Sequence, residues 1–143
     1  MINNNMQKTV CFVRCIYRDD IIHHYCGYVG ITKNDVSVIN TELLKTISDK
    51  DKKWLEYDAI ASKLNVHGGV TFSSNVPRTT PIIPISDIPN NWHEYHYYGF
   101  DLNHYGDDVN GVSTNFEYAV KETLNMQKQI GELIAQYVPS TGD

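Results

Sequence analysis

The chain has 143 residues, of which 41% are hydrophobic and 20% are charged, and its formal net charge is −5. This composition is that of a globular chain, not a disordered one, and the length allows one domain with a real core. The acidic balance argues against broad binding to a nucleic acid polymer, which relies on clustered Lys and Arg, although a local basic pocket for one small anion remains open. We expect a single domain over residues 1–143.

No apolar run is long enough to span a bilayer, and the opening residues lack the basic-then-apolar pattern of a secretion signal. We therefore expect no membrane partner and a cytoplasmic location, the host cytoplasm if the gene is carried by a phage. The three cysteines, Cys11, Cys15 and Cys26, agree with a reducing compartment and read as small buried hydrophobes.

The first third of the chain predicts a hairpin. Residues 8–18 and 23–31 are rich in β-branched and aromatic side chains, and the Arg18–Asp20 segment between them indicates a turn. Gly27 and Gly30 inside the second strand predict a bulge or a close approach to a helix or a ligand. Residues 34–47 fit helical spacing but also alternate in part.

The middle of the chain is less regular. Residues 56–66 form either a short helix or an irregular approach to a strand near 66–73. Residues 75–91 carry four of the five prolines and predict an extended surface loop. The segment 92–102 then returns as a strand, centred on 95–102.

The last element is the clearest. Apolar side chains recur at three and four residues between Phe116 and Tyr137, which predicts a helix over about 115–137. Thr114 and Glu117 have the spacing of a capping box. Together the elements predict an α+β fold, in which an antiparallel sheet carries the long C-terminal helix on one face.

Two polar segments, "VHGGVTFSS" at 66–74 and "YYGFDLNHYGDD" at 97–108, stand out because histidines and acids lie beside glycines. Together with "CGYVG" at 26–30, they resemble a family of small uncharacterised phage and bacterial proteins with HGG[LV]T[YF]S and GFDxxHxGD motifs. The resemblance covers about 26–134 and implies candidate positions, not an activity. The family usually has tryptophans at the places of Tyr97 and Tyr98, and often cysteine at the place of Leu102; the polar positions match.

The polar positions predict acid–base chemistry. His67, Asp101 and His104 are the candidate catalytic residues, because a carboxylate orients an imidazole and stabilises its cation. We expect them to meet in one cleft with Asp107 at its rim and the proline-rich loop alongside. The candidate ligand-binding residues are Gly68, Gly69, Thr71, Arg78, Tyr98, Tyr105 and Asp107.

Other interpretations of the same residues stay open. Asp101, Asn103 and Asp107 are also good turn formers, and His67 also suits a structural role. A metal site built from His67, Asp101, His104 and Asp107 lacks a known signature, as does a Cys/His cluster from Cys11, Cys15, His24 and Cys26. We expect no metal and no cofactor. Ser73 or Ser74 as a nucleophile lacks the G-x-S-x-G elbow, and Cys26 in a strand is more typical of a core.

Three functions are consistent with the sequence. The first is a binding protein for a nucleotide-like small molecule, which in a phage would sequester a host immune signal; tyrosines would stack on the base, and Arg14, Arg18, Lys33 or Arg78 would hold phosphates. The second is a hydrolase or transferase that uses the His/Asp site on a nucleotide or glycosidic bond. The third is a structural protein whose tyrosines form a homo-oligomer interface.

Overall fold

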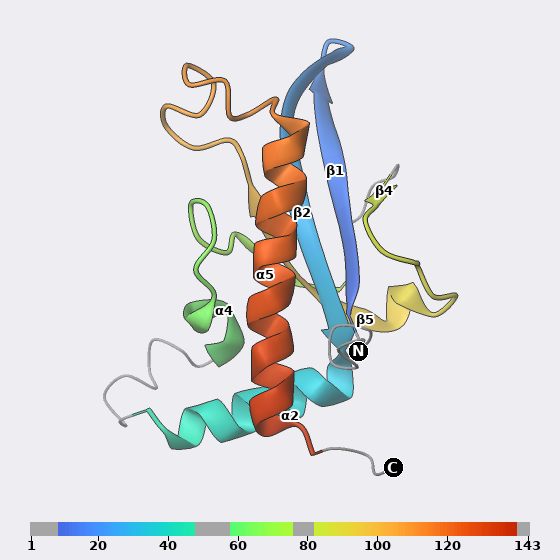
Figure 1. Ribbon diagram of the computed structural model, residues 1–143, viewed down its shortest axis with the longest axis vertical. Helices are drawn as coiled ribbons and strands as arrows, with labels where there is room; N and C mark the ends of the chain where they lie inside the picture. Colours follow the sequence, from blue (N-terminus) through green and yellow to red (C-terminus); the bar gives the residue numbers. More distant parts are fainter. Residues whose placement is uncertain (1–8, 48–57, 76–81, 140–143) are drawn as a thin grey trace.

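A computed structural model describes residues 9–47, 58–75 and 82–139 (Figure 1). Five strands form one antiparallel sheet in the order β3-β5-β2-β1-β4, and the long helix α5 (Phe116–Tyr137) lies along one face of it. The predicted α+β fold, with an antiparallel sheet and a C-terminal helix on one face, is therefore confirmed.

The centre of the sheet is the hairpin of β1 (Val10–Arg18) and β2 (Ile21–Thr32). Asp19 and Asp20 form its two-residue turn with φ angles of 53° and 65°. Positive φ at both positions is the signature of the tight turns that match strand twist, and aspartate tolerates it better than most residues. The pairing shifts register between Ile16 and Tyr17, close to the turn.

The remaining strands are shorter than β1 and β2. The strand β5 (Tyr95–Asp101) pairs with β2, and β3 (Phe72–Ser74) pairs with the outer edge of β5. Of the strand predicted near 66–73, only the end is extended, because the Gly68–Gly69 turn occupies its start. The segment 92–102 begins as a 3₁₀ turn, Trp92–Glu94.

The proline-rich segment is only partly a free loop. Within its described part, β4 (Ile83–Pro84) pairs with the edge of β1, where a proline is tolerated because one side of the strand needs no N–H donor. This edge is the far side of the sheet from β3. The described part of the segment therefore does not border the His67 region, contrary to expectation, and Arg78 lies outside the described residues.

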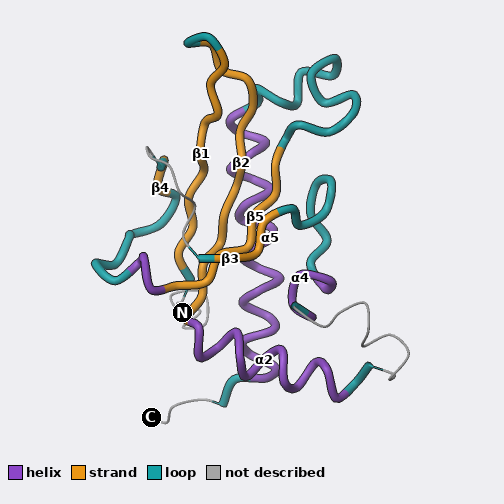
Figure 2. Tube along the Cα trace, turned by 180° about the vertical axis from the view of Figure 1, so that it is seen from behind, coloured by secondary structure: helices purple, strands orange, loops and turns teal. Residues whose placement is uncertain are grey.

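The three α-helices of the described residues all contribute to one buried cluster with the sheet. One of them crosses the end of the sheet, below the long C-terminal helix in Figure 1 and also at the bottom of Figure 2. The helix α2 (Lys33–Lys45) settles the ambiguous segment, and the side chain of Thr32 caps its start. The five-residue α4 (Ala59–Lys63) follows the Asp58 cap. Asn115, not Thr114, caps α5, since its side chain accepts a hydrogen bond from the Tyr118 N–H. The predicted capping box was wrong by one residue.

A buried cluster lies on each face of the sheet. The larger one joins the sheet to the helices through Val13, Val29, Ile39, Met126 and Ile130. The smaller one, on the opposite face, centres on Phe12, Tyr28 and Tyr97. A Cβ at Gly27 would overlap the Thr123 hydroxyl and the Phe100 ring, so this glycine lets α5 approach β2 closely.

Candidate functional site

His67 sits in a tight loop between α4 and β3. The Gly69 N–H closes the turn on the Val66 carbonyl, and Gly68 and Gly69 have φ angles of 68° and 83°. A Cβ at Gly68 would overlap the His104 ring. Glycine at position 68 is therefore needed both for its left-handed backbone and to let two histidine loops touch.

Asp107 organises the facing loop, residues 102–115. Its carbonyl accepts hydrogen bonds from the N–H groups of Val112 and Ser113. Its carboxylate accepts a hydrogen bond from the backbone N–H of His104 at 2.9 Å and lies 2.9 Å from the Nε2 atom of the His67 ring. Asp107 is 6% exposed, so it lies inside this network and not at a rim. Burial alone would raise its pKa, but the His104 N–H and the His67 ring outweigh burial, and the pKa is lowered.

His67 connects Asp107 to α5. An ionised carboxylate can only accept, so the Nε2 atom of His67 carries a proton towards Asp107. The Nδ1 atom lies 3.0 Å from the Tyr118 hydroxyl, which donates to it when the ring is neutral. The backbone N–H of His67 donates to the Glu122 carboxylate at 2.6 Å. Asp107, His67 and Tyr118 thus form a carboxylate–imidazole–phenol chain, which we call the His67 chain.

Asp101 and His104 meet less well than the sequence predicts. The Asp101 carboxylate accepts the Thr71 hydroxyl at 2.9 Å and the Asn103 N–H at 3.0 Å. The Nε2 atom of His104 lies 3.3 Å from Asp101 but is not aligned for a hydrogen bond. It is a buried ring nitrogen without a hydrogen-bond partner among the described residues, and the His67 and His104 ring centres lie 5.9 Å apart.

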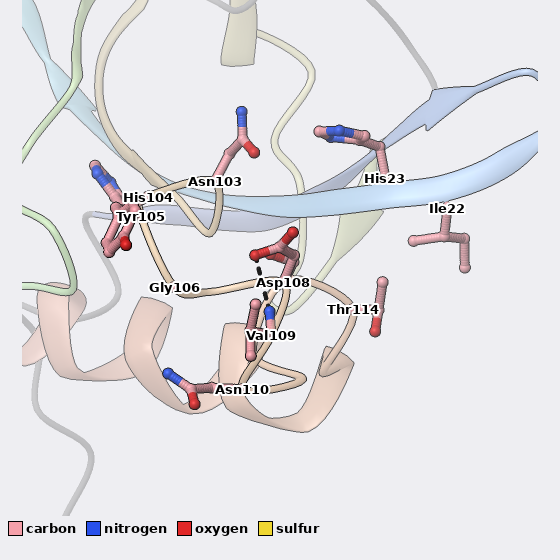
Figure 3. Close-up of a pocket in the computed structure, with 11 residues that line it drawn as sticks. Ile22, His23, Asn103, His104, Tyr105, Gly106, Asp108, Val109, Asn110 and Thr114 are labelled. Carbon is pink, nitrogen blue, oxygen red and sulfur yellow. Dashed lines mark hydrogen bonds between the residues drawn. The ribbon is translucent and has the colours of Figure 1, made fainter.

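An open pocket of about 890 Å³ adjoins His104, between β2 and the 102–115 loop (Figure 3). Ile22 and His23 line it from β2, and Asn103, His104 and Asn110 line it from the loop. The other described lining residues are Tyr105, Gly106, Asp108, Val109, Ser113 and Thr114. His67, Asp101 and Asp107 are not among the lining residues, so the pocket reaches only one member of the predicted catalytic set.

The predicted ligand-binding residues therefore scatter. Tyr105 lines the pocket and is fully exposed, whereas Tyr98 is fully buried and donates its hydroxyl to Asp58. Thr71 contacts Asp101, and Gly68 contacts His104. Nothing lies within 4 Å of a Cβ placed on Gly69, which leaves that backbone open. The roles of these residues remain predictions.

A second polar cluster, which the sequence did not indicate, lies at the free edge of the sheet. The Ser73 hydroxyl lies 2.5 Å from Asp58 Oδ2 and 2.9 Å from His96 Nε2, and we call these three residues the Ser73 cluster. Asp58 also accepts the Tyr98 hydroxyl at 2.9 Å and the Ala61 N–H at 3.3 Å. Burial raises the pKa of Asp58, but donation from His96, Ser73 and Tyr98 outweighs it, and the pKa is lowered.

The histidine pair at the start of β2 is also coupled. The Nδ1 atoms of His23 and His24 lie 2.7 Å apart, so one ring must be the donor and the other the acceptor. Burial, and then the His23 charge, lower the pKa of His24, while Asp101 opposes the shift. His23 is the member that faces the pocket.

Cys11, Cys15 and Cys26 are free thiols, and burial raises the pKa of Cys11 to about 12 and that of Cys26 to about 11. Such thiols are poor nucleophiles at neutral pH. Across the described ranges, no three His, Cys, Asp or Glu side chains converge as a metal ion would require.

Comparison with known proteins adds no relative to these observations. No family model, curated protein or solved structure that we compared with the chain matches it. Within residues 9–47, 58–75 and 82–139, no helix has the length and apolar character needed to cross a membrane.

Proposed function

We propose that the protein binds a small, mainly uncharged polar molecule, nucleoside-like in size, in the pocket beside His104. The observation that carries the proposal is the lining of the pocket, whose volume is about 890 Å³. It combines side-chain amides, hydroxyls and imidazoles with Ile22, Tyr105 and Val109. Pockets with an apolar part and a few converging polar groups are the usual sites for small molecules.

The charge of the lining favours a neutral ligand over a phosphorylated one. None of the described lining residues is Lys or Arg, and Asp108 contributes a carboxylate. Arg14, one of the cations expected to hold phosphates, instead donates to the Tyr28 hydroxyl. A nucleotide signal would bring its phosphates to this acidic rim without a counter-charge. We therefore narrow the proposed ligand to a nucleoside or a sugar-like molecule, which the exposed Tyr105 ring would contact by stacking.

Ligand-detected NMR with a panel of nucleosides, their nucleotides and simple glycosides tests this proposal. We expect nucleosides or glycosides to bind more tightly than the matching nucleotides, and Asn103→Ala or Asn110→Ala to weaken binding by about tenfold, the effect of one lost hydrogen bond. Asn91→Ala is the matched control, since Asn91 is exposed and outside the pocket. Equal binding by all variants, or preferential binding of nucleotides, would contradict the proposal.

A second candidate function is acid–base catalysis on such a ligand, and the His67 chain favours it. A carboxylate behind an imidazole that faces a hydroxyl is the arrangement that moves protons in many hydrolases. Burial, then Glu122 and Asp107, raise the pKa of Tyr118, so this phenol stays protonated and suits a proton donor. His104 links the His67 chain to the pocket, because its backbone N–H donates to Asp107 and its side chain lines the pocket.

Recovery of the bound molecule separates the two candidates. The protein is incubated with each panel compound, free compound is removed, and the released material is analysed after heat denaturation. A binder returns the compound unchanged, whereas an enzyme of the hydrolase or transferase class returns a product. For the enzyme, Tyr118→Phe and His67→Gln would abolish turnover while leaving binding in the pocket within about twofold.

A further inference from the structure

The large exposed hydrophobic side chains of the described residues gather at one end of the molecule. Seven are exposed, and all except Leu124 lie at the tip of the β1–β2 hairpin, in the 102–115 loop or at the first residue of α5. Figure 1 shows the hairpin tip and this loop at the same end. We call these six residues the hairpin-end surface: Tyr17, Ile21, Ile22, Tyr105, Val109 and Phe116.

Five of the six residues are linked through neighbouring contacts, whereas Ile21 is paired with Arg18 and follows the alternation of the strand to the other face of the hairpin. Tyr17 is paired with Ile22 across the hairpin. Ile22 lines the pocket together with Tyr105 and Val109. On the helix side, the Tyr25 ring lies 5.4 Å from the Phe116 ring, and Tyr25 is paired with Cys15, two residues before Tyr17 on β1. The surface therefore runs across the hairpin, the pocket rim and the start of α5.

Exposure of this kind calls for a covering partner. Ile21 is 71% exposed and Val109 is 86% exposed, although the chain has two well-buried clusters that hold most of its other large apolar groups. Single exposed hydrophobic residues are ordinary, but five that join one another around a pocket mark an interaction site.

The charges around the surface define the chemistry of that partner. Four carboxylates lie among or beside the six residues, namely Asp19, Asp20, Asp108 and Glu117, against one cation, Arg18. None of the four forms an ion pair with another described residue. The described charges at this end therefore sum to a negative value, and their field favours a partner that brings positive charge to the rim.

We propose that the hairpin-end surface binds a protein segment that combines aliphatic or aromatic side chains with Arg or Lys. A second copy of this chain would bring the same four carboxylates to face each other, which like charges disfavour. An anionic lipid surface is disfavoured for the same reason. The partner's apolar side chains would cover Tyr17, Val109 and Tyr105, and its cations would meet Asp19 and Asp20.

This inference is independent of the ligand proposed for the pocket, although the two surfaces share Ile22, Tyr105 and Val109. A docked partner would lie across the mouth of the pocket. Ligand binding in the pocket is measured with the isolated protein, so failure of one proposal leaves the other testable.

Selection from a random displayed peptide library against the full-length protein tests the inference. Two variants remove the two features of the surface. Tyr17→Ser with Val109→Ser removes exposed apolar area, and Asp19→Asn with Asp20→Asn removes charge while keeping residues that tolerate positive φ. Leu124→Ser, 42% exposed on α5, is the matched control for lost apolar area elsewhere.

We expect enriched peptides to carry both Arg or Lys and aliphatic or aromatic residues. The serine double variant should weaken a selected peptide by about tenfold or more, and the asparagine double variant by about twofold to fivefold. Leu124→Ser should leave binding unchanged. Enrichment of acidic or uncharged peptides, no enrichment at all, or equal binding to the serine variant would overturn the proposal. Two further results would also overturn it: self-association in sedimentation that the serine variant abolishes, and binding of the protein to phosphatidylserine vesicles.

Discussion

The His67 chain and the Ser73 cluster use the same three kinds of group in a different order. In the first, the imidazole of His67 lies between the Asp107 carboxylate and the Tyr118 hydroxyl. In the second, the Ser73 hydroxyl lies between the Asp58 carboxylate and the His96 imidazole. Both carboxyl groups have a lowered pKa, so each cluster contains an ionised acid.

The order decides what each cluster can do. An imidazole between an acid and a phenol can pass a proton along, since its two nitrogens exchange donor and acceptor roles. A serine between an ionised acid and an imidazole gives its only proton to the acid and accepts from the ring. The first arrangement therefore suits proton transfer, whereas the second suits fixing β3 against the start of α4. Residue types alone do not distinguish the two, but connectivity does.

The largest effect should come from Asp107, because its side chain and backbone both hold the 102–115 loop. We expect Asp107→Asn to reduce the free energy of unfolding by about 2–4 kcal/mol, since the amide carries no charge and places an NH2 donor against the donor nitrogen of the His67 ring, which faces both carboxylate oxygens in the wild type. Urea denaturation measures the change. Asp108→Asn is the matched control, because that exposed carboxylate accepts, among the described residues, only the backbone N–H of Val109. Equal losses in the two variants would show that the His67 chain does not organise this loop.

A smaller loss of stability is expected at Tyr98, the buried residue that donates to the Asp58 carboxylate of the Ser73 cluster. Tyr98→Phe removes the hydroxyl donor 2.9 Å from Asp58 and leaves the ring in place, which should cost about 1–2 kcal/mol. Tyr105→Phe, at a fully exposed ring, should be neutral in the same urea experiment. Tyr98→Phe should also leave ligand binding in the pocket unchanged. Weakened ligand binding with unchanged stability would return Tyr98 to the ligand-binding role predicted from sequence.

The two clusters also show how far the sequence leads. Local sequence patterns are enough to predict the α+β fold, the hairpin turn at Asp19 and Asp20, and the long helix. The motifs around His67 and His104 contain the three residues His67, His104 and Asp107, which lie together in the structure. The spacing of Asp101 and His104 predicts one acid–histidine contact, and these side chains lie 3.3 Å apart. The contact between Asp107 and His67 did not follow from any spacing, because it depends on the fold of the loop.

The Ser73 cluster was missed for a physical reason. The cluster joins a helix cap, Asp58, to an edge strand, Ser73, and a central strand, His96. No spacing in the sequence predicts that these three residues meet. Only the pairing of Ser73 with Tyr98 in the β3–β5 ladder places the serine near His96. One signal was available: Asp58 directly precedes a helical segment, which is typical of a capping residue.

Acid should weaken the fold through both clusters. Because the folded-state pKa values of Asp58 and Asp107 are lowered, each ionised carboxylate adds stability at neutral pH that is lost as the pH falls below about 4. We expect the free energy of unfolding to fall through this range in the wild type, less steeply in Asp58→Asn or Asp107→Asn, and least in the double variant. Urea denaturation at a series of pH values measures the slopes. Parallel slopes in all four proteins would contradict the assignment.

The smallest effect should come from Ser73 itself, and it tests the order of groups most directly. Ser73→Ala removes an exposed hydroxyl, while Asp58 keeps its donors from Tyr98 and Ala61, so we expect a loss below about 1 kcal/mol. Without the hydroxyl, the Nε2 atom of His96 loses its 2.9 Å partner and retains only Asp58, at 3.5 Å. The imidazole NMR signals of His96 should therefore shift in Ser73→Ala and stay unchanged in Ser74→Ala, the exposed neighbour. A stability loss as large as that of Asp107→Asn would mean that the serine is a central support of the fold, and unshifted His96 signals would mean that it is not bonded to the ring.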